Sequence, residues 1–185
     1  MKKIFVFCGI LMALFTGCKE DDTVVPNPEN KDKTNFQLIT EGNWEVSVGT
    51  IVPEISIEFM GNTIVVDEYW DLLAYQNGGV VADCNKDDLM LIKSDSTVVL
   101  DEGPTKCDVN DPQTEDGGSW KFLENESKIE FSSFPFDPTG APQTLDITKL
   151  TKDSLHLEML YTFINPTDMT DSTIHTIRIN YSNTK

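Results

Sequence analysis

Residues 155–163, Leu-His-Leu-Glu-Met-Leu-Tyr-Thr-Phe, place a large apolar side chain at every second position. Successive side chains of a β-strand point to opposite faces, so this period of two predicts a strand with one buried face. Most of the intervening residues are polar, and Leu160 is the exception. The same period recurs in residues 44–48, 54–59, 120–122, 129–131 and 177–181. We therefore expect a chain of β-strands that share one apolar core.

Turn sequences separate these strands. Two shorter apolar runs, Leu89–Ile92 and Val98–Leu100, flank Ser94-Asp95-Ser96, whose residue types are typical of a hairpin turn. Many short strands joined by frequent turns predict an all-β fold, an antiparallel up-and-down β-barrel of about eight strands. Two facing sheets would have the same pattern, so the sequence leaves open whether the barrel is closed.

Residues 67–76 are the exception to the period of two. Their apolar side chains recur three or four positions apart, after an acidic start and before Asn77-Gly78-Gly79. These start and stop signals predict one short helix. The alternative is that Ile64-Val65-Val66 continues as a longer strand.

The first residues have the layout of an export signal. Lys2 and Lys3 precede the apolar run Ile4–Phe15, which has the length of a signal-peptide core and is too short to span a bilayer. Residues 14–18, Leu-Phe-Thr-Gly-Cys, resemble the cleavage motif of bacterial lipoproteins, although Phe15 stands where that motif usually has Leu. The resemblance implies cleavage before Cys18 and acylation of Cys18, which would anchor the chain in a membrane.

The residues after this cysteine suggest a location. Lys19-Glu20-Asp21-Asp22 resembles the acidic export signal of Bacteroidetes-type lipoproteins, which implies display on the outer membrane surface of a Gram-negative bacterium. A secretory signal followed by a solvated linker is the alternative. We expect a signal peptide at residues 1–17, an acylated cysteine with a disordered tether at 18–35, and one barrel domain at 36–185.

The charge of the chain excludes one class of partner. The formal net charge is −17, and removal of Lys2 and Lys3 with the signal takes it to −19. So acidic a protein repels phosphate backbones, and we therefore expect no nucleic-acid binding.

Two cysteines remain after Cys8 leaves with the signal and Cys18 is acylated. Cys84 and Cys107 form an even pair in an oxidising compartment, which predicts a disulfide worth about 3 kcal/mol on the loop-entropy model. The alternative is a metal site, but no histidine lies near either cysteine at a zinc-like spacing.

Gly42-Asn43-Trp44 opens the first long predicted strand, and Arg178, the only arginine, lies in the last one. The pattern continues in residues 84–89 and 101–108 and in Gly118-Ser119-Trp120. It resembles that of the lipocalin-like lipoproteins of Bacteroidetes, and the resemblance extends over about Leu38 to Tyr181. The resemblance implies a calycin-type barrel in which Arg178 stacks on Trp44 and no residue is catalytic. The alternative is that Trp44 is ordinary core and Arg178 an exposed strand residue.

Metal binding has one weak candidate. Asp83, Asn85 and Asp87 have the spacing of the start of a calcium loop, but Asp88 replaces its glycine and Ser94 its final glutamate. We therefore expect no metal.

Catalytic patterns are also missing. His156 and His175 are the only histidines, and their surroundings are typical of surface and strand-end positions. The sequence contains no nucleophile elbow, phosphate loop or dinucleotide fingerprint. We expect neither an enzyme nor a cofactor.

Aromatic residues supply the remaining lead. Tyr69, Trp70 and Tyr75 surround the predicted helix, and Phe134 and Phe136 lie in a proline-rich loop, so they are candidates for the rim of a ligand cavity. The alternative is that they cap the core. Two functions follow: a carrier that holds a small apolar or amphipathic ligand in the barrel mouth, or an adaptor whose loops meet a protein or glycan partner. An apolar cavity favours the carrier, and a solid interior favours the adaptor.

Overall fold

The computed structural model describes residues 33–185 except 60, 77, 80, 134–140 and 167. Two α-helices are present, α1 (Asn35–Glu41) and α2 (Tyr69–Gln76), with short 3₁₀ turns η2 (Asp83–Asn85) and η3 (Glu124–Glu126). The strands are β1 (Trp44–Phe59), β2 (Asn62–Glu68), β3 (Leu89–Ile92), β4 (Thr97–Asp101), β5 (Thr114–Leu123), β6 (Lys128–Phe131), β7 (Gln143–Leu150), β8 (Ser154–Ile164) and β9 (Ser172–Asn183).

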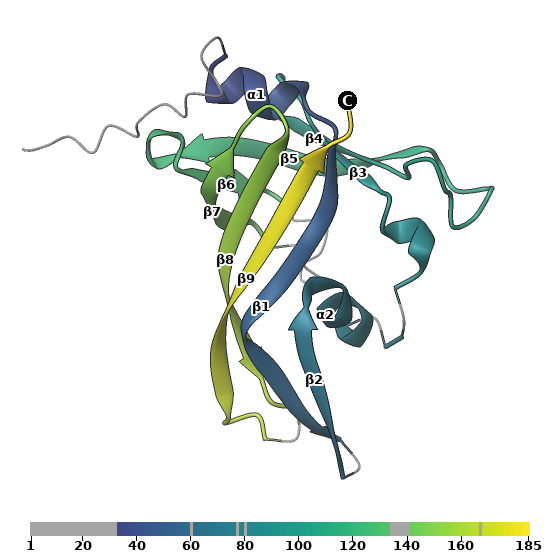
Figure 1. Ribbon diagram of the computed structural model, residues 1–185, viewed down its shortest axis with the longest axis vertical. Helices are drawn as coiled ribbons and strands as arrows, with labels where there is room; N and C mark the ends of the chain where they lie inside the picture. Colours follow the sequence, from purple (N-terminus) through teal and green to yellow (C-terminus); the bar gives the residue numbers. More distant parts are fainter. Residues whose placement is uncertain (1–32, 60, 77, 80, 134–140, 167) are drawn as a thin grey trace, which may run out of the picture.

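The strands close into a barrel (Figure 1). Each strand from β3 to β9 pairs antiparallel with the next, and β1 pairs with both β3 and β9. Eight strands, β1 and β3–β9, therefore form the closed antiparallel barrel that the sequence predicted. Closure also excludes the alternative of two separate facing sheets. A ninth strand, β2, pairs only with β1 and lies outside this circuit.

Strand β1 pairs with different strands along its length, and the side chains that point inward change at one position. Trp44 and Glu45 pair with β3, whereas residues 55–59 pair with β2. Val46 pairs with Tyr181, and Val48 pairs with the adjacent residue of β9, Asn180. Ser47 is therefore an extra residue in β1 and forms a bulge. The bulge reverses the alternation, and Val48 is 51% exposed instead of lying inside with Trp44 and Val46. The inward position expected for Val48 was therefore wrong.

Large side chains fill the interior of the barrel. Trp44, Phe131 and Tyr181 are the bulkiest of the fully buried residues, and apolar side chains from every barrel strand pack around them. Burial of each large apolar side chain stabilises the fold by about 1.5–3 kcal/mol.

Helix α1 closes one end of the barrel, which we call the α1 end (Figure 1). It was not predicted, and it begins inside the segment assigned to the tether. Thr34 caps it, because its side chain accepts from the Gln37 backbone N–H while the Gln37 side chain accepts from the Thr34 N–H. Leu38 and Ile39 are buried against the barrel, and Phe36 stacks on Trp120 with ring centroids 5.9 Å apart.

Helix α2 lies at the opposite end, which we call the α2 end (Figure 1). The predicted helix is confirmed but starts at Tyr69, because Asp67 and Glu68 belong to β2. It packs closely on β1 at Gly49, where an added Cβ would lie 2.2 Å from Cβ of Tyr69. Only glycine permits this approach, which buries Tyr69, Leu72 and Leu73.

Candidate binding site

Three of the five aromatic residues predicted to form a rim are described, and they are buried to different degrees. Tyr69 is buried, Trp70 is partly buried, and Tyr75 is 36% exposed with its ring 6.3 Å from that of Phe163. Helix α2 therefore packs Tyr69 against the barrel core and leaves Tyr75 partly exposed. Phe134 and Phe136 lie outside the described residues.

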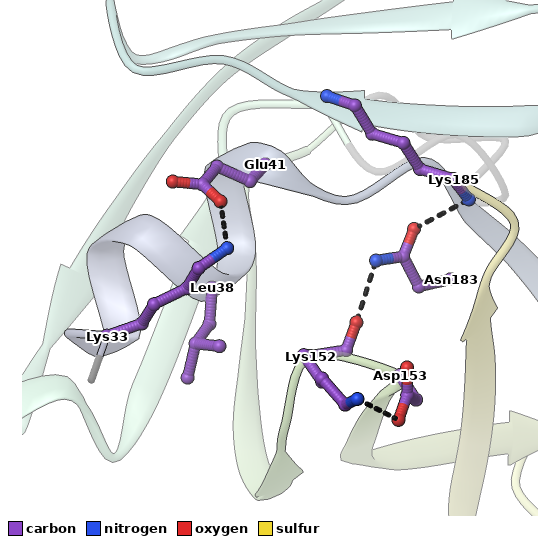
Figure 2. Close-up of a pocket in the computed structure, with 7 residues that line it drawn as sticks. All are labelled: Lys33, Leu38, Glu41, Lys152, Asp153, Asn183 and Lys185. Carbon is purple, nitrogen blue, oxygen red and sulfur yellow. Dashed lines mark hydrogen bonds and ion pairs between the residues drawn. The ribbon is translucent and has the colours of Figure 1, made fainter. Parts of the chain in front are cut away.

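A pocket does occur at the α1 end, outside the barrel interior (Figure 2). Its volume is about 380 Å³, within the usual range of small-molecule sites. Three segments line it: α1 with the residue before its N-cap, the β7–β8 turn, and the end of β9. The lining residues are Lys33, Leu38, Glu41, Lys152, Asp153, Asn183 and Lys185.

Asn183 holds the walls of this pocket together. Its Oδ1 accepts from the backbone N–H of Asn43 at 3.0 Å and of Lys185 at 3.1 Å. Its Nδ2 donates to the carbonyl of Lys152 at 2.7 Å. One amide thus joins the start of β1, the β7–β8 turn and the end of β9, which positions the lysines of the pocket.

Charged side chains of both signs line the pocket. Lys33 pairs with Glu41, and Nζ of Lys152 lies 3.8 Å from Asp153. Lys185 makes no ion pair with another residue in the described part of the chain, and its ammonium group is unpaired in Figure 2. Counted by side chains, three ammonium groups stand with two carboxylates at this pocket, and each carboxylate pairs with a lysine.

The expected stacking of Arg178 on Trp44 is wrong. Arg178 pairs with Thr50, six positions along β1 from Trp44, and its side chain lies on the outer face with Nε 2.9 Å from Glu158. Trp44 points inward, and its Nε1 donates to the Ile39 carbonyl at 2.9 Å. The structure confirms the alternative, in which Trp44 is an ordinary core residue and Arg178 is an exposed strand residue.

The packing of Trp44 explains why residue 42 is a glycine. A Cβ at Gly42 would lie 2.4 Å from Cε2 of Trp44, so the indole lies directly over the glycine backbone. The Gly42-Asn43-Trp44 motif therefore allows Trp44 to fold back under α1.

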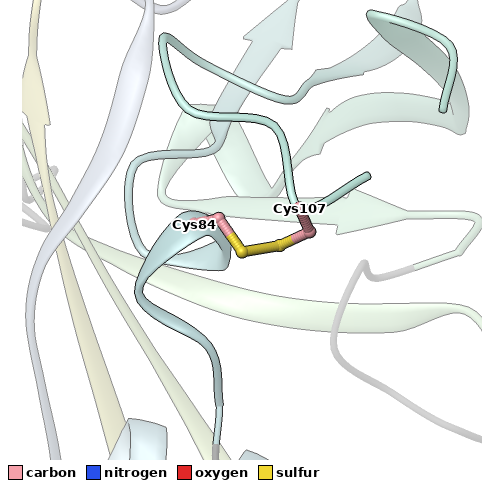
Figure 3. The surroundings of a disulfide bond; sticks show 2 residues. All are labelled: Cys84 and Cys107. Atoms are coloured by element: carbon pink, nitrogen blue, oxygen red, sulfur yellow. A yellow bond between two sulfur atoms is a disulfide. The ribbon is translucent and has the colours of Figure 1, made fainter. Parts of the chain in front are cut away.

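Cys84 and Cys107 form the predicted disulfide, with their Cα atoms 5.3 Å apart (Figure 3). It joins η2, on the segment that leads from α2 to β3, to the β4–β5 loop.

Carboxylates gather beside the disulfide, and of the two aspartates proposed for calcium Asp87 belongs to this group whereas Asp83 does not. Asp83 is turned to solvent and pairs with Lys86 at 2.9 Å, whereas Oδ1 of Asp87 is buried. The structure therefore does not bring Asp83, Asn85 and Asp87 together around one point. Within the described ranges, no group of three or more His, Cys, Asp or Glu residues is arranged to hold a metal ion.

Asp88 is the perturbed member of this acidic group. Burial, followed by the negative charges of Glu102 and Asp87, raises the pKa of Asp88 to about 6, although a hydrogen bond from Asn85 opposes the shift. A carboxyl with this pKa makes the stability of the fold depend on pH.

The histidines do not form a site together. His175 is buried rather than at the surface, with Nδ1 2.7 Å from the Pro53 carbonyl and Nε2 2.6 Å from the Thr173 hydroxyl. Because a carbonyl only accepts, Nδ1 carries the proton, and both ring nitrogens are occupied. His156 lies apart on the outer face, where partial burial and then Lys149 lower its pKa.

Sequence reasoning missed the lysines of the pocket. Lys33, Lys152 and Lys185 stand in no motif, and no sequence signal sets them apart from the other lysines of the chain. Neither described α-helix has the length and apolar character needed to cross a membrane. No protein-family model matches the chain, and no curated protein is similar enough to match it.

Proposed function

We propose that this protein is a lipid-anchored, non-catalytic binding protein of the outer membrane surface, and that it takes a small anionic amphipathic ligand in the pocket beneath α1. The observation that carries this proposal is the pocket of about 380 Å³ with three lysines around one buried leucine. The ammonium groups suit a carboxylate or phosphate headgroup, and Leu38 offers an apolar contact to a short chain.

The packed interior moves the proposed ligand site from the barrel mouth to this pocket. Trp44, Phe131 and Tyr181 occupy the barrel core, and α2 packs Tyr69 against that core at the end where the rim was expected. A lipocalin-like ligand-binding role is compatible with the eight-strand barrel, but the ligand would bind under the helix that closes it.

The anchor is proposed from the sequence around Cys18. Labelling cells with a palmitate analogue tests it, with Cys18→Ala as the control. Label on the wild-type chain alone supports the anchor, and label that survives Cys18→Ala refutes it.

The ligand class is tested by titrating the processed chain with decanoate and with decanol, its uncharged counterpart, in a calorimeter. We expect decanoate to bind more tightly than decanol. Lys185→Gln should weaken decanoate binding about tenfold, the effect of one lost charge-assisted hydrogen bond.

Lys149→Gln is the matched control, because it removes the same charge from an exposed position of β7 that does not line the pocket. It should leave the affinity for decanoate unchanged. Equal affinities for decanoate and decanol, or equal losses in the two lysine variants, would refute the proposal.

A further inference from the structure

The outer surface of the barrel carries exposed aliphatic residues near the α2 end. Strands β2, β1, β9 and β8 form a four-stranded region there, and α2 contacts β1, β2 and β9. On the outer side, Leu160 is 76% exposed, Ile174 65%, Ile164 50% and Val52 47%. Single exposed aliphatic residues are ordinary, so their arrangement decides whether they matter.

Strand register places these side chains next to one another. Thr176 of β9 lies between Leu160 of β8 and Val52 of β1, and Ile174 is opposite Thr162. Leu160 and Ile174 are therefore diagonal cross-strand neighbours, within reach of each other across the sheet. We call the resulting surface the outer patch, formed by Val52, Leu160, Thr162, Ile164, Ile174 and Thr176.

Acidic residues border the outer patch. Residues 50–76 and 159–177, which supply the whole region, contain seven Asp or Glu residues and no Lys or Arg. Asp168 and Asp171 lie exposed in the turn at one end of the patch. At the other end Arg178 is paired with Glu158, so its charge is already compensated.

We infer that the outer patch docks a polypeptide segment with an aliphatic centre flanked by Lys or Arg residues. The aliphatic side chains would pack against the patch, and the basic flanks would meet the acidic border. A second copy of this chain is disfavoured, because its own acidic border would face Asp168 and Asp171. An anionic membrane surface is disfavoured for the same electrostatic reason. The patch lies away from the pocket beneath α1, so this inference does not depend on the proposed ligand.

Three synthetic peptides test the inference on the full processed chain by fluorescence anisotropy. The first has alternating Leu and Thr residues between two pairs of Lys, the second replaces its Leu residues with Ser, and the third replaces its Lys residues with Glu. We expect only the first to bind, with an affinity that falls as salt rises. Binding of the Ser peptide as tightly as the first, or of the Glu peptide, overturns the inference.

Two variant pairs locate the contact. Leu160→Thr with Ile174→Thr should reduce the affinity for the first peptide tenfold or more. Val48→Thr is the control, because Val48 is also exposed on the outer face, at 51%, but lies beyond Arg178 along the sheet. The exposed positions of all three residues suit threonine in a strand, and thermal unfolding of each variant checks that the barrel is intact.

The charge contribution has its own control. Asp168→Asn with Asp171→Asn should weaken binding and flatten its salt dependence. Asp95→Asn removes a carboxylate with the same geometry from another turn, since Asp95 and Asp168 each accept from the backbone and hydroxyl of the residue two positions on. If Asp95→Asn lowers the affinity for the first peptide as much as Asp168→Asn with Asp171→Asn, the placement of the site is overturned.

Self-association and lipid binding are measured in parallel. Sedimentation of the processed chain without its acyl group should show a monomer, and vesicles rich in anionic lipid should not bind it. A dimer dispersed by the Leu160→Thr and Ile174→Thr pair, or vesicle binding lost in that pair, would identify a different occupant and overturn the inference.

Discussion

The two ends of the barrel differ in how they close and in the charges they carry. At the α1 end, a capped helix covers the core, Trp44 donates a hydrogen bond to it, and lysines line the adjacent pocket. At the α2 end, a helix packs on β1 through Gly49, and the nearby residues 50–76 and 159–177 include acidic residues but no Lys or Arg.

This difference assigns a different kind of binding to each end. A concave pocket lined by three lysines suits a small anion, because the ligand is surrounded and its charge is compensated. A flat aliphatic face with an acidic border suits a larger basic partner, because only an extended surface can cover it. The two proposals together give one barrel two sites of opposite charge preference.

The largest expected effect concerns the contrast in packing. Trp44→Ala removes a fully buried indole and its hydrogen bond to Ile39, and should lower the free energy of unfolding by about 3–5 kcal/mol. Tyr75→Ala, at the partly exposed ring of the α2 end, should cost only about 1 kcal/mol. Urea unfolding measures both, and similar losses would contradict the contrast.

The disulfide links the segment that leaves α2 to the β4–β5 loop. Replacing Cys84 and Cys107 with Ser should lower the free energy of unfolding by about 3 kcal/mol, because the unfolded chain regains the freedom of the intervening loop. Amide hydrogen exchange should show faster opening of residues 81–88 than of β8 and β9. Equal acceleration throughout the barrel would show that the two ends open as one unit.

Gly49→Ala tests how the α2 end is closed. The added Cβ would lie 2.2 Å from Cβ of Tyr69, so α2 must shift, at a cost of about 1–3 kcal/mol. The loss of amide protection should be confined to α2 and the adjoining part of β1. Unchanged protection in α2 would mean that the helix does not depend on this contact.

The smallest expected effect is the pH dependence due to Asp88. Its pKa of about 6 in the folded protein is above the unfolded value, so the folded state holds the proton more tightly and stability falls as pH rises from about 4 to about 6. Because solvent screens this partly exposed group, the loss is on the order of 1 kcal/mol. Asp88→Asn should remove this slope and raise the stability at pH 7.

Other carboxyls do not mask that slope. Hydrogen bonds lower the pKa values of Asp83, Asp95 and Asp168, so their contributions vary only below their ordinary range, near pH 4 and lower. His156, whose pKa is lowered, makes stability rise with pH in the upper part of the same window, so the contribution of Asp88 is the difference between the wild-type and Asp88→Asn curves measured at intervals between pH 4 and pH 7. If Asp88→Asn keeps the wild-type dependence of stability on pH, another group is responsible for it.

Much of the fold could be predicted because its signals are local. The alternation of residues 155–163 is borne out in β8, and the helical spacing of residues 67–76 is borne out in α2. Helix α1 was missed because Asn35–Glu41 is short, and its burial comes from contacts with distant strands rather than from its own pattern.

The candidate site was less predictable for a related reason. Of the aromatic residues expected at a rim, Tyr69 is buried because α2 packs on β1, whereas Tyr75 stays partly exposed. Arg178 did not reach Trp44, because strand register places it six positions away on the opposite face. Neither the depth of a helix nor the register between distant strands can be read from residue types alone.

The amino-acid sequence by itself determined the strand-rich character, the short helix at α2, the cysteine pair and the strongly acidic charge, since each depends on neighbouring residues or on composition. Only the tertiary structure decided that the barrel closes through β1 and β9, that Ser47 turns Val48 outward, and that Lys33, Lys152 and Lys185 meet at one pocket. The physical reason is that a period of two selects a face within one strand, whereas closure and pockets require contacts between residues far apart in the chain.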